Sequence, residues 1–154
     1  MLSEAEKREV DAELMTVPTR QAASIGAMKR IQASRGWISD ATLADLADYL
    51  ELSTAELEGV ATFYNLIFRR PVGRHVILVC DSISCWVLGC TKLQSRLHAQ
   101  LGTVAGEATE DGRFTYIPMA CLGACDKAPV LMVDDDLHTH VDPDALGSIL
   151  EAYP

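Results

Sequence analysis

Four of the chain's five cysteines form two close pairs, and this arrangement constrains the fold more than any other feature of the sequence. Cys80 and Cys85 have four residues between them, and Cys121 and Cys125 have three. Each pair follows a short apolar segment that predicts a β-strand. If these strands are parallel neighbours, both pairs leave the same end of one sheet, and four sulfurs converge there.

The strands that lead into the two pairs are predicted from local composition. His75–Val79 is apolar and rich in β-branched residues, which indicates a buried strand running into Cys80. Phe114–Met119 predicts a second strand that ends just before Cys121. Between them we expect a helix from about Leu88 to Leu101, followed by a polar loop.

The end of the chain completes an α/β pattern. Val130–Val133 and Leu137–Val141 flank three aspartates, which predicts a hairpin with an acidic turn. Asp142 suits a helix cap and Pro143 the first helical position, so a last helix should follow. The order β-α-β-β-α, in about 80 residues, is the topology of a reduced thioredoxin fold.

The first half of the chain has helical periodicity throughout. The first helix is expected over Glu4–Met15. A second is expected to begin at Pro18, which makes Val17 an unfavourable cap, and to end near Gly36.

Two serines mark the starts of the remaining helices in this half. Ser39 predicts the cap of a third helix, and Ser53 with Glu56 forms a capping box before a fourth, which should run through Tyr64. We therefore predict an α+β chain, with an N-terminal helical bundle over 1–72 and a thioredoxin-like domain over 73–154.

Charge and hydropathy argue against several classes of function. The chain has 154 residues and a formal net charge of −9, which disfavours nucleic acid as a partner. No apolar run approaches the ~20 residues of a membrane-spanning helix. Residues 1–10 resemble neither a secretory signal nor a transit peptide, so we expect a cytoplasmic protein or a mature form whose presequence has been removed.

The two cysteine pairs admit several chemistries. Four thiolates are the usual ligands of a 2Fe–2S cluster, which is the favoured interpretation. A structural zinc site is the main alternative, although zinc pairs are usually spaced C-x2-C. The chain has no C-x-x-C pair, which also disfavours a thioredoxin-like disulfide reductase. Its odd number of cysteines disfavours a disulfide framework.

The remaining metal-binding residue types have simpler interpretations. Cys90 falls early in a predicted helix, where packing as a small buried residue is favoured over a reactive thiol. His138 and His140 are two apart on a predicted strand and could hold a metal, but sheet surface is the commoner outcome. Trp86, beside Cys85, could cover the site or simply pack.

Four blocks of sequence together resemble one known family. These blocks are Arg35–Asp40 (RGWISD), Glu58–Tyr64 (EGVATFY), Val79–Ser82 (VCDS) and Cys121–Pro129 (CLGACDKAP). They are similar to the E subunit of bacterial NADH–quinone oxidoreductase, respiratory complex I. The resemblance covers nearly the whole chain.

The resemblance implies a thioredoxin-like domain that holds one 2Fe–2S cluster on Cys80, Cys85, Cys121 and Cys125, with Cys90 outside the motif. It implies an F subunit partner that binds NADH and FMN, in the peripheral arm on the cytoplasmic side of the inner membrane. The cluster would exchange one electron with FMN. The chain has no dinucleotide-binding loop, so it would be a subunit without a complete active site. Related subunits serve NAD-linked hydrogenases and formate dehydrogenases, which stay open as alternative settings.

Overall fold

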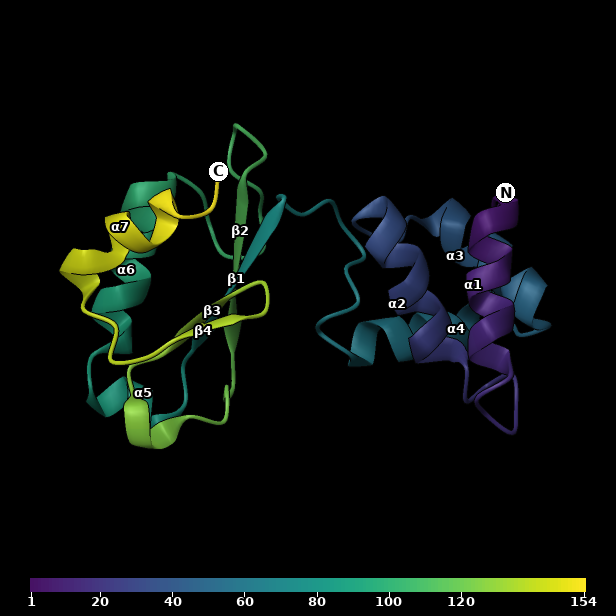
Figure 1. Ribbon diagram of the computed structural model, residues 1–154, viewed down its shortest axis with the longest axis horizontal. Coiled ribbons are helices and arrows are strands. Elements are labelled where there is room, and N and C mark those ends of the chain that lie inside the picture. The colour runs from purple at the N-terminus through teal and green to yellow at the C-terminus, as the bar shows by residue number, and fades with distance from the viewer. The chain divides into compact units, whose positions relative to one another are not determined.

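A computed structural model describes all 154 residues. The chain divides into two compact units, Met1–Pro71 and Val72–Pro154. The first contains only helices, and the second combines helices with a four-stranded sheet (Figure 1), as the α+β prediction requires. None of the helices combines the length and the apolar character needed to cross a membrane.

Four helices build the first unit: α1 (Glu4–Leu14), α2 (Ser24–Arg35), α3 (Asp40–Leu50) and α4 (Thr54–Phe63). Three of them begin at a serine whose hydroxyl accepts a hydrogen bond from a backbone N–H in the first turn. These serines are Ser3, Ser39 and Ser53, so the caps predicted for α3 and α4 are confirmed. The cap at Ser3, a capping box with Glu6, has the same sequence signature and went unpredicted.

The predicted start of the second helix is wrong. Pro18 does not open α2, which begins six residues later at Ser24. The intervening residues form hydrogen-bonded turns, in which the Thr19 hydroxyl accepts from Ala22 N–H and Arg20 C=O accepts from Ala23 N–H. The helix ends as predicted at Gly36, whose φ of 81° suits a residue without a Cβ.

One ion pair links three helices of this unit. The Glu6 side chain on α1 is only 10% exposed and accepts from Arg35 Nε at 2.5 Å and Nη2 at 2.8 Å. Arg35 Nη1 also donates to the Thr42 hydroxyl on α3 at 2.9 Å. Hydrogen bonding from Arg35 lowers the pKa of Glu6 to about 2. The pair therefore fixes the C-terminal end of α2 against α1 and α3.

The sheet of the second unit confirms the central prediction about topology. Its strands are β1 (His75–Cys80), β2 (Phe114–Met119), β3 (Leu131–Val133) and β4 (Asp136–His138), in the spatial order β2-β1-β3-β4. β1 and β2 are parallel neighbours, and the other two pairings are antiparallel. The β3–β4 hairpin is shorter than predicted, because its turn consists of residues 134–135 and β4 stops before His140, which has a positive φ.

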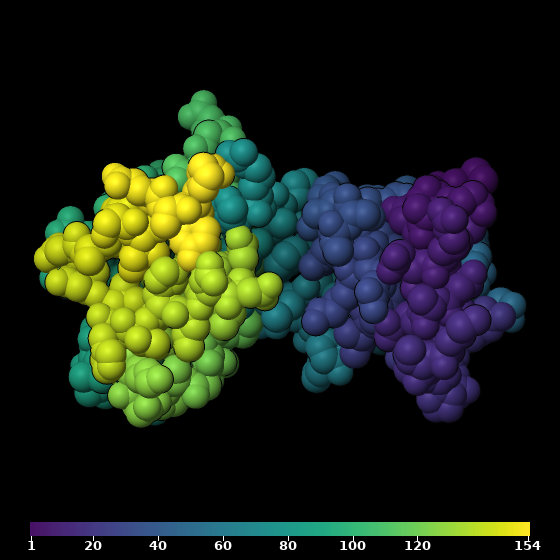
Figure 2. All heavy atoms as spheres, in the orientation of Figure 1, coloured from purple at the N-terminus to yellow at the C-terminus, as the bar shows by residue number.

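Three α-helices and two 3-10 turns complete this unit. α6 (Cys90–Leu101) and α7 (Leu146–Glu151) lie together on one side of the sheet in Figure 1, and α6 contacts both α7 and β1. Figure 2 shows the yellow-green and yellow atoms of the C-terminal part covering much of this unit's visible face. The predicted last helix begins as a 3-10 turn, Pro143–Ala145, with Asp142 as its cap.

The helix predicted from about Leu88 to Leu101 is confirmed as α6, which begins two residues later, at Cys90. A separate short helix, α5 (Ile83–Val87), precedes α6, and Gly89 breaks the two apart with a φ of 98°. Most residues cannot adopt this conformation without strain, so the glycine allows the chain to turn between the helices. As a result, Cys85 lies on its own helix beside the end of β1.

Candidate metal centre

The parallel pairing of β1 and β2 brings all four predicted ligands to one end of the sheet. Cys80 is the last residue of β1 and pairs with Met119, the last residue of β2, so Cys121 follows close by. Cys85 lies on α5, and Cys125 begins the 3-10 turn Cys125–Lys127. Figure 1 shows α5 and this yellow-green turn together at one end of the sheet, and the C-terminus of the chain near the other end.

The two pairs differ sharply in exposure. Cys80 and Cys85 are each 1% exposed, whereas Cys121 and Cys125 lie at the surface. The buried pair packs in an apolar cluster with Cys90, Ala128 and Val130, and Leu122 and Ala124 pack against it. All five cysteines are free thiols. The site therefore has one thiol pair buried away from solvent and one pair exposed to it.

The exposed pair has the separation that a shared metal requires. Cys121 Sγ lies 3.8 Å from Cys125 Sγ. Two sulfurs bound to one tetrahedral metal, at about 2.3 Å each, are about 3.8 Å apart. Gly123 N–H donates to Cys121 Sγ at 3.3 Å, and the φ of 78° at Gly123 lets the loop turn back on itself. No group of three or more His, Cys, Asp or Glu side chains surrounds a point that a single ion could occupy.

Burial and mutual contact raise the pKa of two of these thiols, those of Cys85 and Cys125. Burial, together with hydrogen bonding to Cys80, raises the pKa of Cys85 to about 11. The pKa of Cys125 is raised chiefly by its hydrogen bond with Cys121, with a smaller contribution from the charge of Cys80. Because thiolate is the ligand species, metal binding here must release protons.

Two donors act in the opposite direction and favour thiolates. A backbone hydrogen bond from Val130 offsets part of the rise in the pKa of Cys85, and one from the Ser84 side chain offsets part of the rise in the pKa of Cys125. Together with the Gly123 N–H, they direct donors at three of the four sulfurs. Such hydrogen bonds orient sulfur ligands and tune the reduction potential of iron–sulfur sites.

The other candidate ligands lie outside this arrangement. Cys90 opens α6 and is 2% exposed, which confirms the packing role, and burial raises the pKa of its thiol. His138 Nε2 bonds to the Tyr153 hydroxyl at 2.8 Å. His140 lies beyond the strand with its φ at 49°, so the two histidines are not consecutive positions on one strand face.

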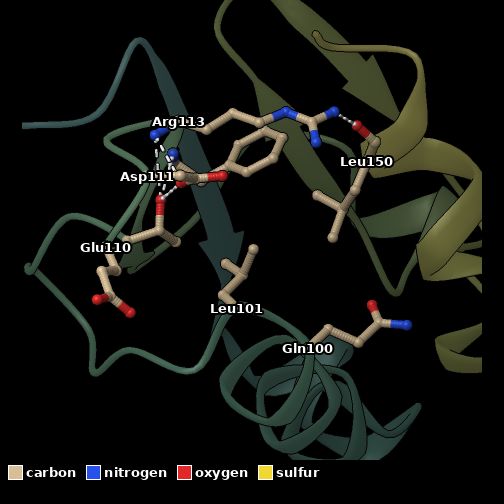
Figure 3. Close-up of a pocket in the computed structure, with 8 residues that line it drawn as sticks. Gln100, Leu101, Glu110, Asp111, Arg113 and Leu150 are labelled. Carbon is tan, nitrogen blue, oxygen red and sulfur yellow. Dashed lines mark hydrogen bonds between the residues drawn. The ribbon is translucent and has the colours of Figure 1, made fainter.

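A hollow of about 470 Å³ lies at the other end of β1 and β2 from the cysteines. The two ends of these strands are roughly 16 Å apart. Figure 3 shows the Arg113 guanidinium above the hollow, donating to the Leu150 carbonyl at 2.7 Å. The Asp111 carboxylate accepts from the Thr109 hydroxyl and from Arg113 N–H. The hollow is lined by neither cysteine nor histidine, so it is separate from the candidate metal centre.

The sequence reasoning missed the outer face of α5. Ile83, Trp86 and Val87 are 69%, 61% and 68% exposed, so Trp86 does not pack into the protein. Ser82 before the helix and Gly89 after it are cap residue types that signal an independent short helix.

Comparison with known proteins identifies the family of the chain. The family model of the thioredoxin-like [2Fe-2S] ferredoxins matches residues 10–154. The E subunit of NADH-quinone oxidoreductase from Pseudomonas aeruginosa is 46% identical over 99% of this chain and 92% of its own length, and that from Escherichia coli K12 is 45% identical over the same shares.

A solved NAD+-reducing [NiFe]-hydrogenase in its H2-reduced state is similar in structure, with a TM-score of 0.68 and 25% identity over 82% of this chain. The match spans only 22% of the hydrogenase chain. The sequence relatives, by contrast, match over almost their whole length. The chain therefore belongs to the thioredoxin-like [2Fe-2S] ferredoxin family, among the E subunits of NADH-quinone oxidoreductase.

Proposed function

We propose that this chain is the electron-transferring E subunit of an NADH–quinone oxidoreductase, and that Cys80, Cys85, Cys121 and Cys125 hold its 2Fe–2S cluster. The observation that carries the proposal is the meeting of two thiol pairs at the ends of parallel strands, with the exposed sulfurs 3.8 Å apart. When bound, such a cluster supplies reversible transfer of one electron.

The arrangement of the pairs fits a binuclear group. A 2Fe–2S cluster needs two protein thiolates on each iron, and Cys121 with Cys125 has the spacing for one iron. Cys80 and Cys85 share one buried cluster, and this pair would hold the other iron. β1 positions Cys80 rigidly, while the loop that carries Cys121 and Cys125 can adapt to the cluster.

The surroundings of the site suit an electron carrier. Ala128 and Val130 exclude water from the buried pair. Gly123, Ser84 and Val130 donate hydrogen bonds that offset the negative charge of the thiolates. The exposed pair leaves one side of the site open, so an electron can cross a short distance to a partner.

The chemistry on NADH would belong to a partner. The sequence has no dinucleotide-binding or phosphate-binding loop. We infer that the partner is the F subunit, which would bind NADH and FMN, and that the chain exchanges one electron with that flavin. It would act as a subunit that lacks a complete active site, in the peripheral arm on the cytoplasmic side of the inner membrane.

The cluster assignment is tested on purified protein produced with iron–sulfur assembly factors. We expect two irons and two sulfides per chain and, after dithionite reduction, a one-electron paramagnetic signal. Serine at any of the four positions should reduce the iron content severalfold. A colourless protein with one zinc and no sulfide would refute the proposal.

Cys90→Ser is the matched control, because Cys90 is as buried as Cys80 and packs in the same apolar cluster. We expect this variant to keep its full iron and sulfide content. Loss of the cluster in Cys90→Ser would show that the ligand assignment is wrong.

A second setting is favoured by the structural similarity to the NAD+-reducing hydrogenase. In that setting the same site would serve an NAD-linked hydrogenase or formate dehydrogenase. Purifying the chain with its native partners separates the possibilities. An NADH-oxidising flavoprotein with quinone reductase activity supports the first, and a nickel protein or a formate-oxidising subunit supports the alternative.

A further inference from the structure

The exposed thiol pair has a geometry that suits a second chemistry besides metal binding. Cys121 Sγ lies 3.8 Å from Cys125 Sγ, and both side chains are at the surface. A disulfide bond joins two sulfurs at about 2.0 Å, so these two atoms need to approach each other by roughly 1.8 Å. Rotation of two exposed side chains and a small adjustment of the loop supply a movement of this size.

The loop between these two cysteines permits this closure. Cys121 follows the end of β2 at Met119, and Cys125 begins a 3-10 turn, so neither cysteine takes part in a strand pairing. Gly123, midway between them, has a φ of 78° and donates its N–H to Cys121 Sγ at 3.3 Å. The loop already turns back on itself and brings the two sulfurs into contact, so the folded chain loses little further entropy when the bond forms.

The other three cysteines are protected from the same reaction. Cys80, Cys85 and Cys90 are 1%, 1% and 2% exposed, and they pack in one apolar cluster. Thiol–disulfide exchange requires contact between a thiolate and a disulfide sulfur, so a disulfide in solution does not reach these thiols in the folded chain. Reaction with such a disulfide is therefore confined to Cys121 and Cys125.

We propose that Cys121 and Cys125 are a modification site of the cluster-free chain, at which a low-molecular-weight disulfide, oxidised glutathione, forms an internal disulfide that blocks cluster loading. One cysteine thiolate attacks a glutathione sulfur, the S–S bond of glutathione breaks, and one reduced glutathione leaves. The second cysteine thiolate then attacks the mixed disulfide and releases a second reduced glutathione. Two electrons pass from the protein sulfurs to glutathione, which also takes up the two protons that the cysteines give up.

The consequence for the site rests on the proposed function, because the disulfide withdraws two of the four proposed ligands. Cys80 and Cys85 alone leave the second iron without protein thiolates. A dithiol reductant reverses the exchange, so the exposed pair couples cluster loading to the redox state of the surrounding thiols. Sulfurs that are bound to iron take no part in the exchange, and the switch therefore acts only on the cluster-free chain.

The modification is tested on the full chain, stripped of metal and fully reduced, in the absence of oxygen. After incubation with oxidised glutathione, the protein is denatured in iodoacetamide, digested with trypsin and analysed by mass spectrometry. Cleavage after Arg113 and Lys127 places both exposed cysteines in one peptide, and cleavage after Arg74 and Lys92 places the three buried cysteines in another. We expect the first peptide to be unalkylated and lighter by two hydrogen atoms, and the second to carry an alkyl group on every cysteine.

Two variants identify the reacting pair. Cys125→Ser lacks the thiol for the second exchange, so it should stop as the mixed disulfide of Cys121 with glutathione. Cys90→Ser is the matched control, because it removes a buried thiol and leaves the exposed pair intact, and it should form the same internal disulfide as the unchanged chain. A disulfide that includes Cys80, Cys85 or Cys90, or glutathione retained on both exposed cysteines of the unchanged chain, would overturn the proposal.

Cluster loading is measured separately, as the iron and sulfide content after transfer from a cluster-loaded scaffold protein without added thiol reductant. We expect the oxidised chain to take up about tenfold less iron than the reduced chain, and prior treatment with dithiothreitol to restore uptake. Equal uptake by the two forms would overturn the switch and leave the proposed function standing. No cluster on the fully reduced chain would refute the proposed ligands, and the switch would fail with them.

Discussion

The Glu6–Arg35 pair predicts how the helical unit loses stability in acid. Arg35 holds the pKa of Glu6 at about 2, against an ordinary value of 4.5. A carboxylate whose pKa is lowered by folding stabilises the folded state above its unfolded pKa, and this stabilisation is lost as the pH falls from about 4.5 to about 2. At about 1.36 kcal/mol per pKa unit, the difference corresponds to about 3 kcal/mol. Because a third of the Arg35 side chain is exposed, we expect about 2 kcal/mol in practice.

Glu6→Gln isolates this charge. Glutamine keeps the hydrogen bonds of the capping box with Ser3 but removes the ionised partner of Arg35. The matched control is Glu4→Gln on the same helix, since Glu4 is 84% exposed and pairs only with Lys7 at the surface. In a Trp86→Phe background, the fluorescence of Trp37 reports unfolding of the helical unit alone.

Urea unfolding at pH 7 and pH 2.5 gives the result. At pH 7, Glu6→Gln should lower the free energy of unfolding by about 2 kcal/mol, and Glu4→Gln should change it by less than about 0.5 kcal/mol. At pH 2.5 the difference between Glu6→Gln and the unchanged chain should fall below about 1 kcal/mol. Equal stability of the two variants at pH 7, or a difference that persists at pH 2.5, would refute the reasoning.

Three further substitutions test local geometry through the free energy of unfolding. Gly73→Ala should destabilise the second unit by about 1–3 kcal/mol, since a Cβ would lie 2.5 Å from the backbone of Phe114, and unchanged stability would contradict the observed approach. Gly59→Ala should stabilise α4 by about 0.5–1 kcal/mol, because nothing lies within 4 Å of the added Cβ; a loss would show a hidden contact. Ser53→Ala should lower the free energy of unfolding by about 1 kcal/mol, because it removes the hydroxyl that accepts from Glu56 N–H. Unchanged stability would show that solvent satisfies this N–H equally well.

The strands around the cysteines were predictable because their signals are local. The apolar run at His75 and the β-branched and aromatic residues after Phe114 predict β1 and β2 closely, and the two strands proved to be parallel neighbours. The serine caps at Ser39 and Ser53 were equally clear, because each places a hydroxyl where the first helical turn needs an acceptor.

The errors arose where several weak signals competed. Pro18 suits the first turn of a helix, but the Thr19 hydroxyl supports a local turn instead, and α2 begins only at Ser24. The apolar residues of α5 gave no helical periodicity, because five residues are too few to show one. That short helix decides both the burial of Cys85 and the exposure of Trp86, so neither could be read from the cysteine spacing.

The unequal burial of the two thiol pairs also sets an order for assembly. Cys80 and Cys85 are enclosed once β1 and α5 pack together, so no iron carrier can reach them from the inner side of the folded chain. Cys121 and Cys125 lie on a surface segment that can open without breaking a strand pairing. If the four thiols hold the proposed cluster, a cluster delivered to the folded protein would enter past residues 121–125, and Cys121 and Cys125 would be the last thiols to close on it and the first to release it.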